Sequence, residues 1–173
     1  MNDRERTDDV IERKVGEALR KQGHTVAPAE SCTGGLIGAR LTAVPGSSDY
    51  VDRGFVTYSY DSKREVLGVS REALDEVGAV SDRVAREMAQ GARDVADVTW
   101  GISATGVAGP GGGTDETPVG TVFIGISYAA PWGTNESYTT ATRHEFDGDR
   151  TAVRTQTVEA ALQRLLSEIQ SLD

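Results

Sequence analysis

The stretch VGTVFIGISYAA at residues 119–130, followed by SYTTATRHEF at residues 137–146, decides what kind of sheet this chain forms. The first run is long and apolar, and the second alternates in the manner of a hairpin partner. A hairpin joins antiparallel neighbours, so a sheet that contains this pair cannot be purely parallel. We therefore predict a mixed sheet.

The remaining segments alternate between strand and helix patterns. Extended runs are predicted at residues 24–29, 50–59 and 98–104. Helices are predicted at residues 8–22, 33–43, 62–67 and 149–172, and after the serines at 70 and 81, which are suitable N-caps. Helices between and beside strands indicate an α/β fold in which helices cover a sheet. With no internal repeat or linker, we predict one domain over residues 1–173, with residues 1–7 flexible.

The charge balance argues against two classes of partner. The chain has 27 acidic and 18 basic side chains and a formal net charge of −9, which disfavours broad contact with nucleic-acid phosphates. No stretch approaches the roughly 18 apolar residues of a membrane span. We therefore expect neither a nucleic-acid nor a membrane partner. Only three of the basic residues are lysines; this suits a salt-rich cytoplasm, although a GC-rich genome gives the same bias.

The single cysteine, Cys32, excludes a disulfide within one chain and a cluster of several thiolates around a metal. A reducing cytoplasm is the expected location. The sequence also lacks the HExxH and CxxC patterns of common metal sites. We therefore expect no metal.

The segment AESCTGG at residues 29–35 lies where an apolar run stops and a helix pattern begins. Free backbone N–H groups at such a point favour negative charge, and they would stabilise an oxyanion formed beside Ser31. The two glycines leave room for a substrate. The alternative is structural: Ser31 or Thr33 caps the helix, and Cys32 is a small buried residue.

A serine nucleophile needs a base that accepts its proton. His24 and His144 lie in strand patterns, and their spacing does not support a Ser-His-Asp triad. Lys63 is the better candidate, because it follows a predicted strand and burial would favour its neutral amine. Tyr58 could orient or relay the proton. The alternative for Lys63 is a solvated helix residue paired with a neighbouring acid.

A glycine-rich loop follows the strand predicted at residues 98–104. Five of the eight residues from 106 to 113 are glycine, so backbone amides can converge on an anion, and Ser103 and Thr105 could add hydroxyl contacts. The loop matches neither the Walker A nor the dinucleotide fingerprint, and a flexible connection is the alternative. Arg150 and Arg154 share a helix face and could clamp a phosphate or carboxylate, or they could be solvated.

Taken together, these motifs resemble the CinA C-terminal domain family. The resemblance covers roughly residues 10–170 and rests on AESCTGG at 29–35, VPGSSDYVDRGFVTYS at 44–59, Lys63 with LGV at 67–69, ATGVAGPGGG at 104–113 followed by PVGTVFI, and DGDRTAVR at 147–154. It implies a three-layer α/β/α fold, a homo-oligomer and no cofactor. The family commonly has YSNEAK where this chain has YSYDSK, so Tyr60 replaces a small amide.

The family includes nicotinamide-nucleotide amidases of the PncC type, which convert nicotinamide mononucleotide to nicotinate mononucleotide and ammonia. Carried over by motif, the resemblance implies Ser31 as the nucleophile, with Lys63 and Tyr58 as its partners. For this small-molecule nucleotide substrate, the expected contacts are Glu30, Cys32, Thr33, Gly34, Ser103, Thr105, Gly106, Gly109, Gly111, Gly112 and Arg150. The alternatives are nucleotide binding without turnover and an amidase for another small amide.

Overall fold

The computed structural model describes residues 10–172, which contain a five-stranded sheet in the order β2-β1-β3-β4-β5. Strand β1 (Val26–Glu30) runs parallel to β2 (Phe55–Val56) and to β3 (Trp100–Gly106). Strands β4 (Thr121–Tyr128) and β5 (Tyr138–Glu145) form the predicted antiparallel hairpin, and β4 is also antiparallel to β3. The prediction of a mixed sheet is therefore confirmed. The flexibility predicted for residues 1–7 lies outside the described residues.

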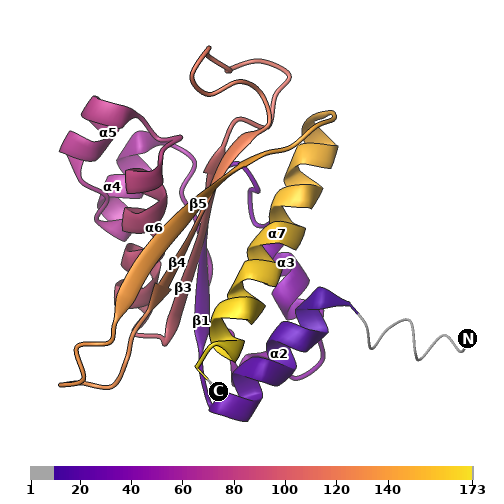
Figure 1. Cartoon of the computed structure of the whole chain (residues 1–173), viewed down its shortest axis with the longest axis vertical. Helices are drawn as coiled ribbons and strands as arrows, with labels where there is room; N and C mark the ends of the chain where they lie inside the picture. Colours follow the sequence, from indigo (N-terminus) through magenta and orange to yellow (C-terminus); the bar gives the residue numbers. More distant parts are fainter. Residues whose placement is uncertain (1–9, 173) are drawn as a thin grey trace, which may run out of the picture.

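Helices cover both faces of this sheet, with α2, α3 and α7 on one face and α4, α5 and α6 on the other (Figure 1). The six α-helices within residues 10–172 are α2 (Ile11–Gln22), α3 (Leu36–Thr42), α4 (Tyr60–Leu67), α5 (Arg71–Val77), α6 (Asp82–Ala96) and α7 (Arg150–Gln170). A short 3-10 helix, η1 (Ser47–Asp49), follows α3. The α/β class and the three-layer α/β/α arrangement are confirmed.

Strand β3 shows how both helical layers pack on one sheet. Trp100, Ile102 and Ala104 belong to the core cluster formed with α2 and α7. The residues between them are small, because α6 passes directly over them. A Cβ at Gly101 would collide with the backbone carbonyl of Ala89 on α6. Alternation of large and small side chains along β3 therefore sets how closely α6 approaches the sheet.

The strand predicted at residues 50–59 is mostly absent. Only Phe55–Val56 pairs with β1 as a strand, and Val51 forms an isolated bridge with Val26. The cause lies in β1: the N–H of Val26 donates to the carbonyl of Tyr50 on this side of the sheet, and Pro28, two residues later, has no N–H to continue the pairing.

The helix predicted to begin at residue 33 begins at Leu36. Gly34 and Gly35 have φ angles of 60° and 104°, in the left-handed region that an α-helix excludes. Residues 31–35 therefore form a turn, which we call the nucleophile turn, and Ser31 lies five residues before the helix rather than two.

The serine caps agree with the prediction at two helices. The hydroxyl oxygens of Ser70 and Ser81 accept hydrogen bonds from the third residue beyond them at the starts of α5 and α6. Helix α4 begins earlier than predicted, because Ser59 and Ser62 form a reciprocal capping box around its first turn. This early start places Lys63 one turn into α4. Among residues 10–172, no helix has the length and hydropathy needed to cross a membrane.

Candidate active site

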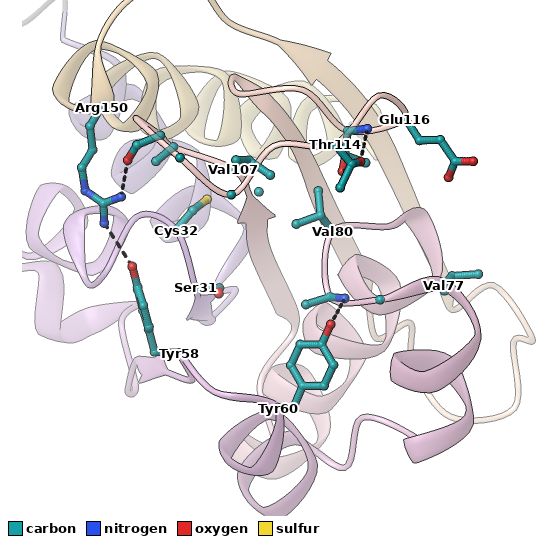
Figure 2. Close-up of a pocket in the computed structure, with 18 residues that line it drawn as sticks. Ser31, Cys32, Tyr58, Tyr60, Val77, Val80, Val107, Thr114, Glu116 and Arg150 are labelled. Carbon is teal, nitrogen blue, oxygen red and sulfur yellow. Dashed lines mark hydrogen bonds between the residues drawn. The ribbon is translucent and has the colours of Figure 1, made fainter.

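A cavity of about 580 Å³ opens at the carboxyl ends of β1 and β3. Eight of the predicted site residues line it, together with residues that were not predicted (Figure 2). The predicted ones are Ser31, Cys32, Tyr58, Gly106, Gly109, Gly111, Gly112 and Arg150. Parallel strands end at the same edge of a sheet, and this is where α/β proteins commonly bind small molecules.

Ser31 and Lys63, which are 32 positions apart in the sequence, meet at this edge. Lys63 Nζ lies 3.0 Å from Ser31 Oγ and also donates to the carbonyl oxygens of Thr57, at 2.7 Å, and Tyr58, at 3.2 Å. The Lys63 side chain is 1% exposed, and burial lowers its pKa to about 8. An amine with this pKa is partly neutral near pH 7, so it can accept the proton of the hydroxyl that it contacts.

The hydroxyl of Tyr58 does not face this pair. Arg150 Nη2 donates to it at 3.0 Å, and Arg150 Nη1 donates to the carbonyl of Gly109 at 2.8 Å. Figure 2 shows the Tyr58 ring directed toward Arg150. Within residues 10–172, Tyr58 contacts Lys63 through its main-chain carbonyl and makes no hydroxyl bond to Ser31 or Lys63. The geometry therefore does not support the predicted proton relay through the Tyr58 hydroxyl.

Glu30, Thr33 and Gly34 were predicted to contact substrate, but none of them lines the cavity. Glu30 is 2% and Thr33 is 0% exposed. The Thr33 hydroxyl donates to the Glu30 carboxylate at 2.6 Å, and the carbonyl of Thr33 accepts from Arg154 Nη2 at 3.0 Å. Glu30 and Thr33 therefore make hydrogen bonds within the protein, on the side of the nucleophile turn away from the cavity.

The nucleophile turn contains two main-chain N–H groups that have no oxygen acceptor within the described part of the protein. Among the described residues, the N–H groups of Cys32 and Thr33 donate to no oxygen acceptor. The N–H of Cys32 directly follows Ser31 at the cavity, where an oxyanion would form after attack on a carbonyl, whereas Thr33 is fully buried. The thiol of Cys32 is buried, and burial raises its pKa to about 12. Its thiolate is therefore strongly disfavoured, which argues for Ser31 as the nucleophile.

Ser103 and Thr105 are also buried away from the cavity, contrary to the prediction that they contact a ligand. The Ser103 hydroxyl donates to the carbonyl of Ala85 at 2.6 Å, and the Thr105 hydroxyl donates to the carbonyl of Ala79 at 2.8 Å. Both point toward the face of the sheet that α6 covers. A hydroxyl buried on that face needs a hydrogen-bond acceptor, and a nearby main-chain carbonyl provides it.

One wall of the cavity was not predicted at all. It consists of Val77, the half-exposed last residue of α5, and residues 78–80 of the connection to α6. The peptide of Ala79 is held at both ends, because its N–H donates to the Tyr60 hydroxyl at 3.2 Å and its carbonyl accepts from Thr105. The sequence feature that could have predicted this wall is VGAV at residues 77–80, because a short connection between helices usually contains polar turn residues rather than valines.

The glycine-rich loop lines the opposite side of the cavity. Gly109 and Gly112 adopt φ angles of 84° and 87°. Within the described residues, the N–H groups of residues 108, 109 and 111–113 have no protein acceptor. Because Arg150 binds the loop at Gly109, a positive charge lies beside these donors, as an anion site requires. Arg154 contacts Thr33 instead, so the two arginines do not form the predicted clamp.

Neither histidine lines the cavity. His24 Nδ1 accepts a hydrogen bond from the indole of Trp100, and His144 contacts Thr142 on its own strand. Within the part of the chain that the structure describes, no three His, Cys, Asp or Glu side chains are grouped so that they could hold a metal ion.

Comparisons with known proteins agree with this fold. The model of a family described as the CinA C-terminal domain matches residues 8–169. The nicotinamide-nucleotide amidohydrolase PncC of Enterobacter agglomerans is 46% identical over 155 residues, covering 90% of this chain and 91% of that protein. The competence/damage inducible protein CihA from Agrobacterium tumefaciens has a solved structure with a TM-score of 0.84 at 40% identity, covering 91% of this chain and 92% of that one.

Other relatives are much longer than this chain. A CinA-like protein of Syntrophobacter fumaroxidans is 46% identical over 157 residues, which are 91% of this chain but 35% of that protein. The chain thus spans about a third of the length of such relatives.

Proposed function

Because this chain belongs to the CinA C-terminal domain family, we propose that it hydrolyses the carboxamide of nicotinamide mononucleotide to nicotinate mononucleotide and ammonia. The observation that carries the proposal is the 3.0 Å contact between Ser31 Oγ and the buried amine of Lys63 at the cavity. The name of the Enterobacter agglomerans relative, a nicotinamide-nucleotide amidohydrolase, supports this substrate class.

In the first half of the reaction, Ser31 Oγ attacks the carboxamide carbon while neutral Lys63 accepts the hydroxyl proton. The negative charge that develops on the carboxamide oxygen is stabilised by the N–H group of Cys32, which lines the cavity beside Ser31. Loss of one such donor typically costs about 3–4 kcal/mol of transition-state stabilisation. The Lys63 ammonium then protonates the departing nitrogen, so ammonia leaves and an ester to Ser31 remains.

In the second half, water attacks this ester and Lys63 again accepts a proton. Collapse of the intermediate transfers the proton from Lys63 to Ser31 Oγ and releases the product carboxylic acid, which loses its proton to water. The glycine-rich loop and Arg150 would bind the ribose phosphate, far from the reacting carbon. Binding energy from this remote group would hold the carboxamide at Ser31.

The test is ammonia release from nicotinamide mononucleotide by the purified protein and by Ser31→Ala. We expect the variant to keep its fold and melting temperature while losing at least 1000-fold in kcat. Comparison with nicotinamide and its riboside reports whether the phosphate matters. Binding of the mononucleotide without ammonia would point to a binding protein, and equal turnover of all three would point to an amidase for other small amides.

A further inference from the structure

Glu30 is a buried carboxylate that the proposed chemistry does not use directly. It is 2% exposed and does not line the cavity, yet it immediately precedes the proposed nucleophile. Its carboxylate accepts four hydrogen bonds. Oε2 accepts from the Thr33 hydroxyl at 2.6 Å and from the N–H groups of Gly35 and Ile37 at 3.1 and 3.0 Å, and Oε1 accepts from the N–H of Gly38 at 2.8 Å.

These hydrogen bonds determine which main-chain N–H groups of the turn are occupied by Glu30 and which have no oxygen acceptor in the part of the protein that the structure describes. The left-handed φ angles of Gly34 and Gly35 let the chain bend around the carboxylate. The donors of residues 35, 37 and 38 then point inward at Glu30. In the described segment 31–38, every main-chain N–H donates to a carbonyl or carboxylate oxygen except those of Cys32 and Thr33.

Ser31 itself is held between two fixed points. On one side its N–H donates to the carbonyl of Ala104 at 3.0 Å, which continues the pairing of β1 with β3. On the other side the turn that follows is attached to Glu30. The direction of Ser31 Oγ toward Lys63 therefore depends on where the carboxylate holds Thr33 and Gly35.

We propose that Glu30 is a positioning residue: it folds the nucleophile turn so that Ser31 Oγ faces Lys63 and the N–H group of Cys32 faces the reacting carbonyl. This inference rests on the proposed function. Glu30 does not touch substrate, because its side chain is buried behind the turn.

A carboxylate performs this task and an amide does not. Three donors converge on Oε2, and a fourth donor meets Oε1. In a glutamine, the oxygen can take the place of Oε2, but the NH₂ group then faces the N–H of Gly38, and two donors cannot bond to one another. Glu30→Gln therefore preserves shape and removes one bond of the set. Thr33→Val removes only the hydroxyl bond and nearly keeps the volume.

The experiment has two independent readouts. The first is kcat and KM for ammonia release from nicotinamide mononucleotide. The second is the rate at which a fluorophosphonate, a general serine-hydrolase probe, adds to Ser31, measured by intact mass spectrometry. The matched control is Glu87→Gln, since Glu87 also accepts from a backbone N–H and a hydroxyl, both of Ser70, as well as from Arg83 Nε at 3.1 Å, but lies outside the cavity.

For Glu30→Gln we expect kcat and the labelling rate to fall about 10- to 100-fold, the loss typical of a nucleophile displaced by about 1 Å. KM, the pH midpoint set by Lys63 and the melting temperature should stay close to those of the control variant. Thr33→Val should show a smaller loss of the same kind, and it provides the test if Glu30→Gln does not fold.

Wild-type rates of turnover and labelling in both folded variants would overturn the inference. A loss that follows the melting temperature equally in Glu30→Gln and Glu87→Gln would overturn it as well, because it would indicate general stability. If the wild-type protein releases no ammonia while Glu30→Gln still slows labelling of Ser31, the proposed function fails and the positioning role stands.

Discussion

The pH dependence of turnover tests the role of Lys63 most directly. The pKa of about 8 makes roughly a tenth of the amine neutral at pH 7, half at pH 8 and nine tenths at pH 9. If only the neutral amine accepts the Ser31 proton, kcat/KM rises about tenfold between pH 7 and pH 9 and then levels off. Substrate and product are followed by proton NMR, with Ser31→Ala as the background. A flat profile, or a midpoint below pH 6.5, would refute the assignment of Lys63 as the base.

The same group makes a matching prediction for stability. Burial lowers the pKa of Lys63 from an ordinary value of 10.5 to about 8, so the unfolded chain binds more protons between these values. The contribution of Lys63 to stability therefore rises with pH across this window and is constant below it. Between pH 7.5 and pH 10 the difference corresponds to about 2 kcal/mol. Chemical denaturation at pH 7.5 and pH 10 measures it, and Lys63→Met should lack this part of the rise. Equal pH slopes in both proteins would contradict the lowered pKa.

Three further substitutions test the cavity walls and the sheet. Arg150→Ala should raise KM for nicotinamide mononucleotide about tenfold, since it removes a charged phosphate donor, and leave KM for nicotinamide unchanged in the same steady-state assay. Tyr60→Phe should raise KM a few-fold with kcat within about twofold, because it frees only the N–H of Ala79; a change confined to kcat would contradict this. Gly101→Ala should lower the melting temperature by about 5–10 °C, because its Cβ would meet the carbonyl of Ala89, and an unchanged value would show that α6 can move away.

The order of elements could be predicted because each depends on local chemistry. Apolar alternation marked the β4–β5 hairpin, and serines marked the starts of α5 and α6. Two of the differences from the prediction have local causes that act on other parts of the chain. Pro28 shortens β2, a strand that is 27 residues away in the sequence, and Gly34 delays α3 through a backbone angle that residue type permits but does not require.

The meeting of Ser31 and Lys63 could be proposed but not located from spacing. It depends on register: Glu30 pairs with Val56 in the parallel β1–β2 ladder, so residues 31 and 57 leave the sheet at the same edge. The capping box at Ser59 then begins α4 at once, and Lys63 lies one turn further, where its chain reaches back across Thr57. Strand pairing and helix start together fix this distance, and neither is visible in a motif.

The predicted ligand residues that lie outside the cavity do so for one physical reason. Sequence reasoning expected polar side chains beside the nucleophile to contact the ligand, and it selected Glu30, Thr33, Ser103 and Thr105. In the structure these side chains bond to the protein's own main chain, because buried polar groups require partners. The donors that remain free in the cavity are mainly backbone N–H groups of the nucleophile turn and the glycine-rich loop. Polar residues in the sequence therefore indicate where side chains hold the main chain by hydrogen bonds. The main-chain N–H groups that remain available to a substrate can be identified only when those hydrogen bonds are known.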